Sequence, residues 1–305
     1  MTYSDVLDGT RWVSDGGLET DLLFNRGIAL PDFASFLLLD DADGTFALRR
    51  YYGEYVAIAA AADAGLLLET PTWRANPDWG SRLGYDRAAL HRVNNVAVEL
   101  VRASATSSGP SSVLVSGVVG PRGDGYIAAG ANAEAAADYH AAQVDSLTDA
   151  GVDLVHAMTM TEPAEAIGVV LAARAAGVPV AVSFTVETDG RLPDGSTLAA
   201  AVNQLENVAP ADWYGVNCAH PTHVLPALDG GPWTDRLRFL RPNASTRSHD
   251  ELDEMEELDS GDIDLLVASA TTARQQAPSI AVIGGCCGTD SRHVAALWGV
   301  AAPQR

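Results

Sequence analysis

Residues 150–185 read AGVDLVHAMTMTEPAEAIGVVLAARAAGVPVAVSFT, and their pattern indicates the fold class. Two apolar runs, Asp153–Met158 and Pro179–Thr185, flank an alanine-rich segment, Pro163–Ala176, that reads as a helix. Proline is tolerated in the first turn of a helix, and Gly177 favours a helix end. Near-continuous apolar runs are typical of parallel strands covered on their outer face. The stretch therefore predicts a strand–helix–strand unit with parallel strands.

The same alternation runs along the whole chain. Strands are expected at Arg11–Asp15, Leu66–Thr70, Val113–Val119, Asp153–Met158, Pro179–Thr185, Trp213–Cys218, Leu237–Pro242 and Ile280–Gly285. Helices are expected at Thr45–Ala64, Arg87–Ser104, Ala133–Ala150, Pro163–Ala176, Thr197–Val208, Pro221–Leu228, Gly261–Gln276 and Asp290–Val300. This count fits a (β/α)8 TIM barrel better than an open doubly wound sheet. We predict an α/β protein with a single barrel domain spanning residues 1–305, since no shift of composition marks a boundary.

Composition excludes several classes of function. The 305 residues carry 40 Asp and Glu against 19 Lys and Arg, a net charge of −21. Nucleic acids and anionic membranes are bound by clustered cations, so neither is expected as a partner. Every one of these cations is arginine, which excludes a lysine Schiff-base mechanism. With no long apolar run and no signal-like N-terminus, we expect a cytoplasmic protein.

An acidic run, SHDELDEMEELDSGDID, occupies residues 248–264. Dense charge of one sign is most simply solvated, so we predict a surface loop or a short surface helix. Cation binding is the alternative, and no chemistry is assigned to the segment.

The chain has three cysteines: Cys218 in GVNC, and Cys286 and Cys287 in IGGCCGT. An odd number in a chain expected to be cytoplasmic argues against a disulfide framework. Reactive groups of a TIM barrel come from the C-terminal ends of its strands, and both motifs end a predicted strand. Adjacent cysteines on a regular strand point to opposite faces, but the flanking glycines allow the backbone to break there. We predict that the three thiols meet on one rim.

Three convergent thiolates suit Zn²⁺ and leave the fourth position open to a substrate or water, as in a catalytic site. The net negative charge of such a site keeps an incoming thiolate electron-rich, which favours attack on an alkyl group over hydrolysis. One alternative is that the cysteines are small buried apolar residues. Another is that His220 or His223, which follow Cys218, binds the metal.

Six segments resemble, in chain order, the landmarks of the homocysteine S-methyltransferase family. The likeness covers nearly the whole chain, and its most specific parts are the two cysteine motifs. It implies a (β/α)8 barrel that transfers a methyl group to a zinc-bound homocysteine thiolate, giving methionine. The segments are SDGGLETDLLFNRG (residues 14–27), TPTWRAN (70–76), GPRGDGY (120–126), GVNC (215–218), RPNAS (241–245) and IGGCCGT (283–289).

The resemblance assigns roles to the cysteines and to one neighbour. Cys218, Cys286 and Cys287 match the family's zinc ligands, which carry the catalysis. Asn217 matches the family asparagine beside the first ligand. The implied cofactor is therefore Zn²⁺.

The resemblance also implies substrate contacts. Asp15 and Gly16 match positions that help to hold the amino acid acceptor. Thr72, Trp73 and Arg74 lie in TPTWRAN, where family members place groups near the methyl donor. Trp73 could face an onium group through cation–π attraction, and Arg74 could bind a carboxylate.

One departure from the family concerns the acceptor. Family members usually carry a Glu-Thr pair at the end of the fourth strand, and its carboxylate meets the acceptor's amino group. This chain has Met158 and Thr159 there. Because a thioether cannot neutralise an ammonium, either Asp15 or another group does so, or the acceptor is not homocysteine. Glu69 lies on a neighbouring strand, while Glu162 is expected to be a capping or surface residue at a helix start.

The leading hypothesis is a zinc-dependent methyltransferase that acts on a small-molecule thiol acceptor and an onium methyl donor. S-methylmethionine, S-adenosylmethionine and a betaine are the candidate donors, because 305 residues leave no room for folate and cobalamin domains. One alternative uses the carboxylates of Asp15, Glu19 and Glu69 for acid/base hydrolase or lyase chemistry. Another is a degenerate homologue that binds zinc or a thiol without turnover.

Overall fold

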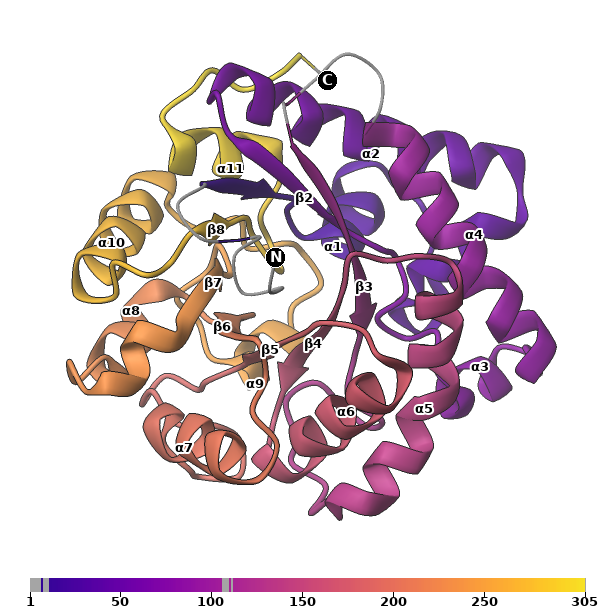
Figure 1. Cartoon of the computed structure of the whole chain (residues 1–305). Coiled ribbons are helices and arrows are strands. Elements are labelled where there is room, and N and C mark those ends of the chain that lie inside the picture. Colours follow the sequence, from indigo (N-terminus) through magenta and orange to yellow (C-terminus); the bar gives the residue numbers. More distant parts are fainter. Residues whose placement is uncertain (1–6, 8–10, 106–109, 111, 305) are drawn as a thin grey trace.

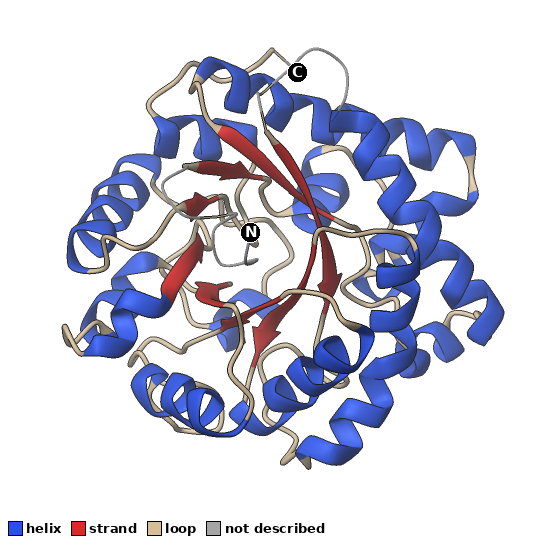
Figure 2. Ribbon diagram, viewed as in Figure 1, coloured by secondary structure: helices blue, strands red, loops and turns tan. Residues whose placement is uncertain are grey.

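The computed structural model describes residues 7, 11–105, 110 and 112–304. Eight parallel strands close into a barrel in chain order, and helices surround it (Figures 1 and 2). The last strand pairs with the first, with Trp12 opposite Val282. The predicted (β/α)8 TIM barrel is confirmed. Its strands are β1 Trp12–Ser14, β2 Gly65–Glu69, β3 Val113–Val119, β4 Leu154–Met160, β5 Val180–Phe184, β6 Trp213–Asn217, β7 Leu237–Arg241 and β8 Val282–Ile283.

The strand–helix–strand unit in the middle of the chain forms as predicted. Helix α6 spans Pro163–Ala176 between β4 and β5. It ends at Gly177, whose φ of 73° lies in the left-handed region that glycine adopts without a Cβ penalty. β4 runs past its predicted end to Met160, and its pairing with β5 shifts in register after Ala157.

The long helices match the predicted segments to within a few residues. Several begin at a residue whose side chain accepts a backbone N–H of the first turn, such as Asp41, Asn132 and Thr197. The short helices α1 and α3 were not predicted, because one or two turns carry no readable period. None of the described helices has the length and apolar character needed to cross a membrane. The helices are α1 Leu18–Thr20, α2 Ala42–Ala61, α3 Pro77–Arg82, α4 Arg87–Ala105, α5 Ala133–Asp149, α6 Pro163–Ala176, α7 Leu198–Val208, α8 Pro221–Val224, α9 His249–Asp253, α10 Ile263–Gln276 and α11 Ser291–Trp298, with shorter helical turns at Asp21–Asn25, Pro31–Phe33, Ser35–Asp40, Leu225–Ala227 and Pro232–Arg236.

The interior of the barrel changes character along its axis. Near the N-terminal ends of the strands it is filled by an apolar cluster of Leu7, Trp12, Leu67, Leu154, Ala181, Trp213, Phe239 and Val282. Closer to the C-terminal ends, buried polar and charged side chains replace it: Ser14, Glu69, His156, Ser183 and Arg241. Burying a charge is costly unless it is paired. This polar layer therefore has to be paired internally, and it forms the floor of the site described next.

Candidate active site

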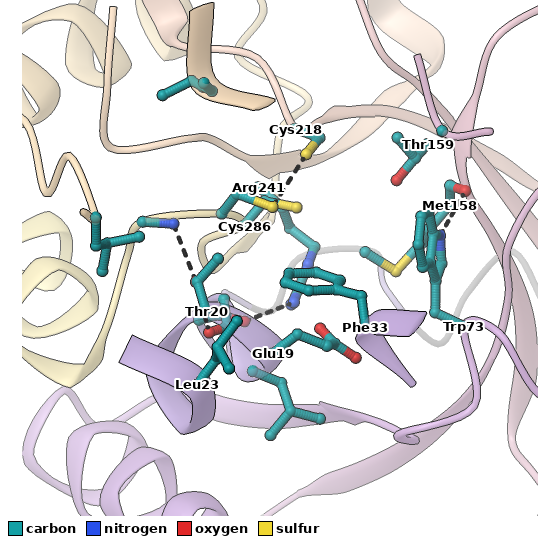
Figure 3. A pocket seen from close by; sticks show the side chains of 18 of the residues that line it. Glu19, Thr20, Leu23, Phe33, Trp73, Met158, Thr159, Cys218, Arg241 and Cys286 are labelled. Carbon is teal, nitrogen blue, oxygen red and sulfur yellow. Dashed lines mark hydrogen bonds between the residues drawn. The ribbon is translucent and has the colours of Figure 1, made fainter. Parts of the chain in front are cut away.

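The three cysteine thiols meet on the rim formed by the C-terminal ends of the strands (Figure 3). Cys218 follows β6, while Cys286 and Cys287 follow β8. Their sulfur atoms all lie within 4.8 Å of one another, and the Sγ atoms of Cys218 and Cys287 are 3.5 Å apart. Within the described part of the chain, no other set of three metal-binding side chains gathers in this way.

The two histidines that follow Cys218 in sequence are engaged elsewhere. Nδ1 of His220 lies 2.7 Å from Oγ1 of Thr222, and Nε2 of His223 lies 3.0 Å from the carbonyl oxygen of Thr246. Neither histidine belongs to the three-thiol cluster. Among the described residues, the three thiols are therefore the side chains grouped closely enough to share one metal ion.

The backbone of Cys218 is held in an unusual conformation. Its φ is 58°, in the left-handed region, which costs a residue with a Cβ roughly 1–2 kcal/mol. Three side chains donate hydrogen bonds to its carbonyl oxygen: Oγ1 of Thr185 at 3.2 Å, Nδ2 of Asn243 at 3.0 Å and Nε2 of His249 at 2.6 Å. These bonds offset the strain and fix the direction of the thiol.

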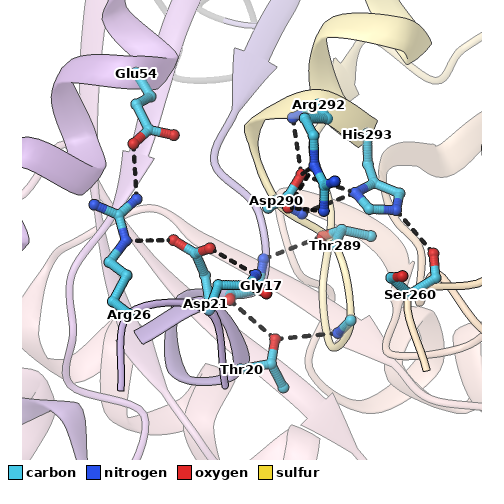
Figure 4. Close-up of polar contacts among 12 residues, drawn as sticks. Gly17, Thr20, Asp21, Arg26, Glu54, Ser260, Thr289, Asp290, Arg292 and His293 are labelled. Atoms are coloured by element: carbon cyan, nitrogen blue, oxygen red, sulfur yellow. Dashed lines mark hydrogen bonds and ion pairs between the residues drawn. The ribbon is translucent and has the colours of Figure 1, made fainter. Parts of the chain in front are cut away.

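The loop that carries Cys286 and Cys287 is tied to the loop after β1 (Figure 4). The amide of Gly17 donates to both the carbonyl oxygen and the hydroxyl of Thr289, each at 3.1 Å. The hydroxyl of Thr20 accepts a hydrogen bond from the amide of Gly288 at 3.1 Å. The first and last βα loops therefore form one rigid unit behind two of the thiols.

A Gly17→Ala substitution is expected to disturb this unit. The new Cβ would lie 2.3 Å from the carbonyl oxygen of Cys286 and 2.7 Å from Oγ1 of Thr20, so the ligand loop would have to move. We expect stability to fall by about 1–3 kcal/mol and metal affinity by about tenfold or more, measured by urea unfolding and metal titration. Gly53→Ala is the matched control, because its Cβ meets nothing within 4 Å. Equal behaviour of the two variants would contradict the prediction.

The three thiols do not share negative charge equally. Hydrogen bonds with the thiols of Cys218 and Cys287 hold the pKa of Cys286 well below its usual value. The charge of Arg241 and the side-chain amide of Asn217, 3.7 Å from the sulfur, act in the same direction. In turn, Cys286 raises the pKa of Cys218, and Cys218 raises the pKa of Cys287.

In protein stripped of metal, Cys286 is expected to react first with iodoacetamide near pH 7, because the thiolate is the reactive form. Mass spectrometry of peptides after addition of one equivalent should find most of the label on Cys286, and bound zinc should protect it. Cys287 is the internal control, since both side chains are partly exposed. Preferential labelling of Cys287, or equal labelling of both, would contradict the assignment.

The acidic segment, residues 248–264, contributes one buried side chain and part of the lining of the cavity. A short helix, α9, forms there as expected, but its first residue His249 is buried. The His249 ring stacks on Tyr126 with 3.9 Å between ring centroids, and the Tyr126 hydroxyl lies 3.1 Å from Sγ of Cys218. The predicted surface helix forms, but the burial of His249 was not expected, because charge density does not reveal which side chains turn inward. The segment also lines the cavity beside the thiols through Leu252, Asp253, Met255, Glu257, Leu258 and Asp259.

Both ring nitrogens of His249 face hydrogen-bond acceptors beside Cys218. Its Nδ1 lies 2.7 Å from Oε1 of Glu187, and its Nε2 lies 2.6 Å from the carbonyl oxygen of Cys218. Burial opposes the charged form, yet these two acceptors raise the pKa of His249 overall. Neither His249 nor Tyr126 was picked out from the sequence, although Tyr126 ends the GPRGDGY segment.

A cavity of about 470 Å³ opens beside the thiols. Asp15, Gly16 and Trp73, three of the residues predicted to contact substrate, line it together with all three cysteines. Figure 3 shows Trp73 and Met158 on one side of the cavity and Glu19 below it. Residues predicted from four separate loops, those after β1, β2, β6 and β8, thus lie around one cavity.

Two other predicted substrate residues do not line the cavity. Thr72 is buried, and its hydroxyl donates to the carbonyl oxygen of Val118 at 2.7 Å. Asn217 binds the end of β4: its Oδ1 accepts from the amide of Thr159, and its Nδ2 donates to Oγ1 of Thr159, both at 2.8 Å. Thr159 has a φ of 61°, so Asn217 supports a second left-handed residue at the rim.

Two carboxylates of the cavity floor each have a close nitrogen partner. Oδ1 of Asp15 accepts from Nη1 of Arg241 at 2.9 Å, and Oε1 of Glu69 lies 2.9 Å from Nδ1 of His156. Burial raises the pKa of Asp15 to about 7, although Arg241 lowers it. Burial also opposes ionisation of Glu69, but His156 lowers the pKa of Glu69 overall. Nε2 of His156 continues the network to Oγ of Ser183 at 2.7 Å.

Met158, which stands where family members usually carry a glutamate, and the nearby Glu162 have different surroundings. Met158 lines the cavity, and its carbonyl oxygen accepts from Nε1 of Trp73 at 3.3 Å. Glu162 precedes α6 as expected, but it makes no side-chain cap and is buried rather than on the surface. Its carboxylate accepts from the amides of Ala129 and Ala131, at 3.0 and 2.9 Å, and so fixes that loop.

Comparison with known proteins agrees with this geometry. The family model for homocysteine S-methyltransferase matches residues 12–300. A homocysteine S-methyltransferase from Escherichia coli K12 is 28% identical over 93% of each chain. Among solved structures, the oxidized form of the E. coli homocysteine methyltransferase MmuM superposes with a TM-score of 0.76, at 25% identity over 96% of this chain and 97% of that one. Its metallated form gives the same TM-score at 24% identity, covering 96% of each chain. The chain belongs to the homocysteine S-methyltransferase family and is an S-methyltransferase.

Proposed function

We propose that the protein holds one zinc ion through Cys218, Cys286 and Cys287 and methylates homocysteine to methionine, using a small onium donor. The observation that carries the proposal is the convergence of three thiols beside a cavity with room for small substrates. The name of the curated relative supports homocysteine as the acceptor, and the metallated form of MmuM supports a metal at the site.

The donor set fits zinc. Thiolates about 2.3 Å from a tetrahedral Zn²⁺ lie roughly 3.8 Å from one another. The observed spacings, 3.5 Å for one pair and within 4.8 Å for all, need only small side-chain adjustments. When bound, zinc acts as a Lewis acid that keeps the acceptor's sulfur in the thiolate form near neutral pH.

The transfer itself is a displacement at carbon. A lone pair of the acceptor's sulfur attacks the methyl carbon, forming a C–S bond while the bond from that carbon to the donor's sulfur or nitrogen breaks. The electron pair of the broken bond stays on the donor atom, which becomes neutral. The thiol proton has already left to solvent.

The chain's own residues prepare the site for this step. Arg241 below the thiols and His249 beside them partly offset the negative charge of the cysteines. At the mouth of the cavity, Asp124, Asp253 and Glu257 favour a cationic donor over an anionic one. The Trp73 ring offers a π face to an onium group.

The test combines metal analysis with a methyl-transfer assay. We expect about one zinc per chain, and methionine formation from homocysteine with at least one of S-methylmethionine, S-adenosylmethionine or glycine betaine. Protein without zinc that still transfers methyl groups would overturn the metal assignment. Zinc and thiol binding without turnover for any donor would instead identify the non-catalytic homologue. We further propose that residues 1–305 act as one domain on small-molecule substrates.

A further inference from the structure

Glu19 differs from the other two carboxylates at the floor of the cavity. Asp15 is bound by Arg241 and Glu69 by His156, each at 2.9 Å. Within the described part of the chain, no arginine or histidine nitrogen lies within 4.0 Å of the Glu19 carboxylate. Glu19 is therefore a carboxylate of the cavity that lacks such a nitrogen partner among the described residues.

The position of Glu19 is fixed while one of its oxygen atoms stays available. It belongs to α1, directly after β1, and its Oε1 accepts a hydrogen bond from Oγ of Ser35 at 2.6 Å. Glu19 lines the same cavity as the three cysteines. Burial raises the pKa of Glu19, and Cys286 adds to this effect. Figure 3 shows the carboxylate directed into the cavity, toward the side where Met158 and Trp73 lie.

Arg74 does not fill the role of a partner for Glu19. Its guanidinium lies over the ring of Trp79, 3.9 Å from the ring centroid, and it donates to the carbonyl oxygen of Asp32. Its attraction lowers the pKa of Glu19 only as a weak contribution, behind burial and the Ser35 hydrogen bond. Glu19 is half-buried, so its carboxylate is partly desolvated without a close cation, and a ligand that brings a cation offsets that cost.

An amino acid acceptor carries such a cation. Its α-ammonium loses water on entering the cavity and needs an anionic partner, which the thioether of Met158 on β4 cannot provide. Resting on the proposed function, we propose that Glu19 binds the α-ammonium of the acceptor, so that the amino group is recognised from the β1–α1 loop instead of from β4. The carboxylates of Asp124, Asp253 and Glu257 are exposed at the mouth, where water screens them.

The experiment compares homocysteine with 4-mercaptobutyrate, which has the same thiol and carboxylate but no amino group. Binding of each thiol to the zinc-loaded protein is measured by calorimetry, so the result does not depend on turnover. The wild-type protein should bind homocysteine about tenfold or more tightly than the analogue. In Glu19→Gln this preference should disappear, with the affinity for the analogue unchanged. Glu256→Gln, the same change at an exposed residue that does not line the cavity, should keep the preference.

A second variant moves the carboxylate to β4. The double substitution Glu19→Ala and Met158→Glu should regain the preference for homocysteine that Glu19→Ala loses. Equal binding of the two thiols to the wild-type protein, or an equal loss of affinity for both in Glu19→Gln, would overturn the proposal. Failure of the proposed function has a different signature: neither thiol is methylated, while the binding preference and its loss in Glu19→Gln persist.

Discussion

A Cys286→Ser variant is expected to lose its zinc and its methyl-transfer activity together. A serine hydroxyl stays protonated near neutral pH and is a poor zinc ligand, whereas the pKa of Cys286 is already lowered by its neighbours. Zinc content should fall from about one to below about 0.1 per chain, and kcat/KM by at least about 1,000-fold, because the ligand is part of the metal site itself. Metal analysis of the purified variant and an assay of methionine formation measure the two losses.

The control for this variant is Tyr126→Phe. It removes the hydroxyl that lies 3.1 Å from Sγ of Cys218 but keeps all three sulfur atoms, so the zinc should be retained. Thermal unfolding in the presence of a chelator should give the same Tm for Cys286→Ser and the wild-type protein, showing that the barrel itself is intact. Full zinc content in Cys286→Ser would show that this thiol is not a ligand.

Replacing Arg241 by methionine is expected to give the largest loss of stability. The guanidinium is buried, donates to Asp15 at 2.9 Å, and also attracts Glu69. Removing one partner of a buried ion pair leaves an uncompensated charge and costs about 3–5 kcal/mol. The measurement is the free energy of unfolding in urea at pH 7. Activity should fall as well, since Arg241 helps to lower the pKa of Cys286.

Two comparisons separate this effect from the loss of any arginine. Arg247→Met breaks an exposed ion pair with Asp259, 3.2 Å apart, and should change stability by no more than about 1 kcal/mol. The double substitution Arg241→Met and Asp15→Asn should recover part of the loss, because it also removes the stranded carboxylate. An Arg241→Met protein as stable as Arg247→Met would contradict the buried-pair argument.

Most of the fold was predictable because the spacing of apolar residues and the residues at helix ends can be read from short stretches of the sequence. The strand over Val113–Val119 and the helix over Pro163–Ala176 have the bounds predicted for them. The short helix α9 was not located, since its start depends on a capping box between Ser248 and Glu251 inside a run of charge. The stacking of His249 on Tyr126 is a tertiary contact that no local sequence pattern indicates.

The site was predictable where its reactive residues directly follow a strand of the barrel. The two cysteine motifs end β6 and β8, so the rule for barrel strands was sufficient to bring the thiols together. Thr72 shows the limit of this reasoning, because its hydroxyl turns to the carbonyl oxygen of Val118 and away from the cavity. The partners of Asp15 and Glu69 come from other strands, so the absence of a cation at Glu19 is visible only in three dimensions.

The placement of the thiols makes metal uptake a late event in the life of the chain. Cys218 comes after the sixth strand and the other two cysteines come after the eighth, so a chain still being synthesised lacks a complete ligand set. The loop after β8 also takes its shape from Gly17 and Thr20, near the opposite end of the sequence. Zinc bound as proposed would stabilise the native state by mass action. We therefore expect the closed barrel to bind the ion more tightly than incomplete or unfolded chains, in which the three thiols are not held together.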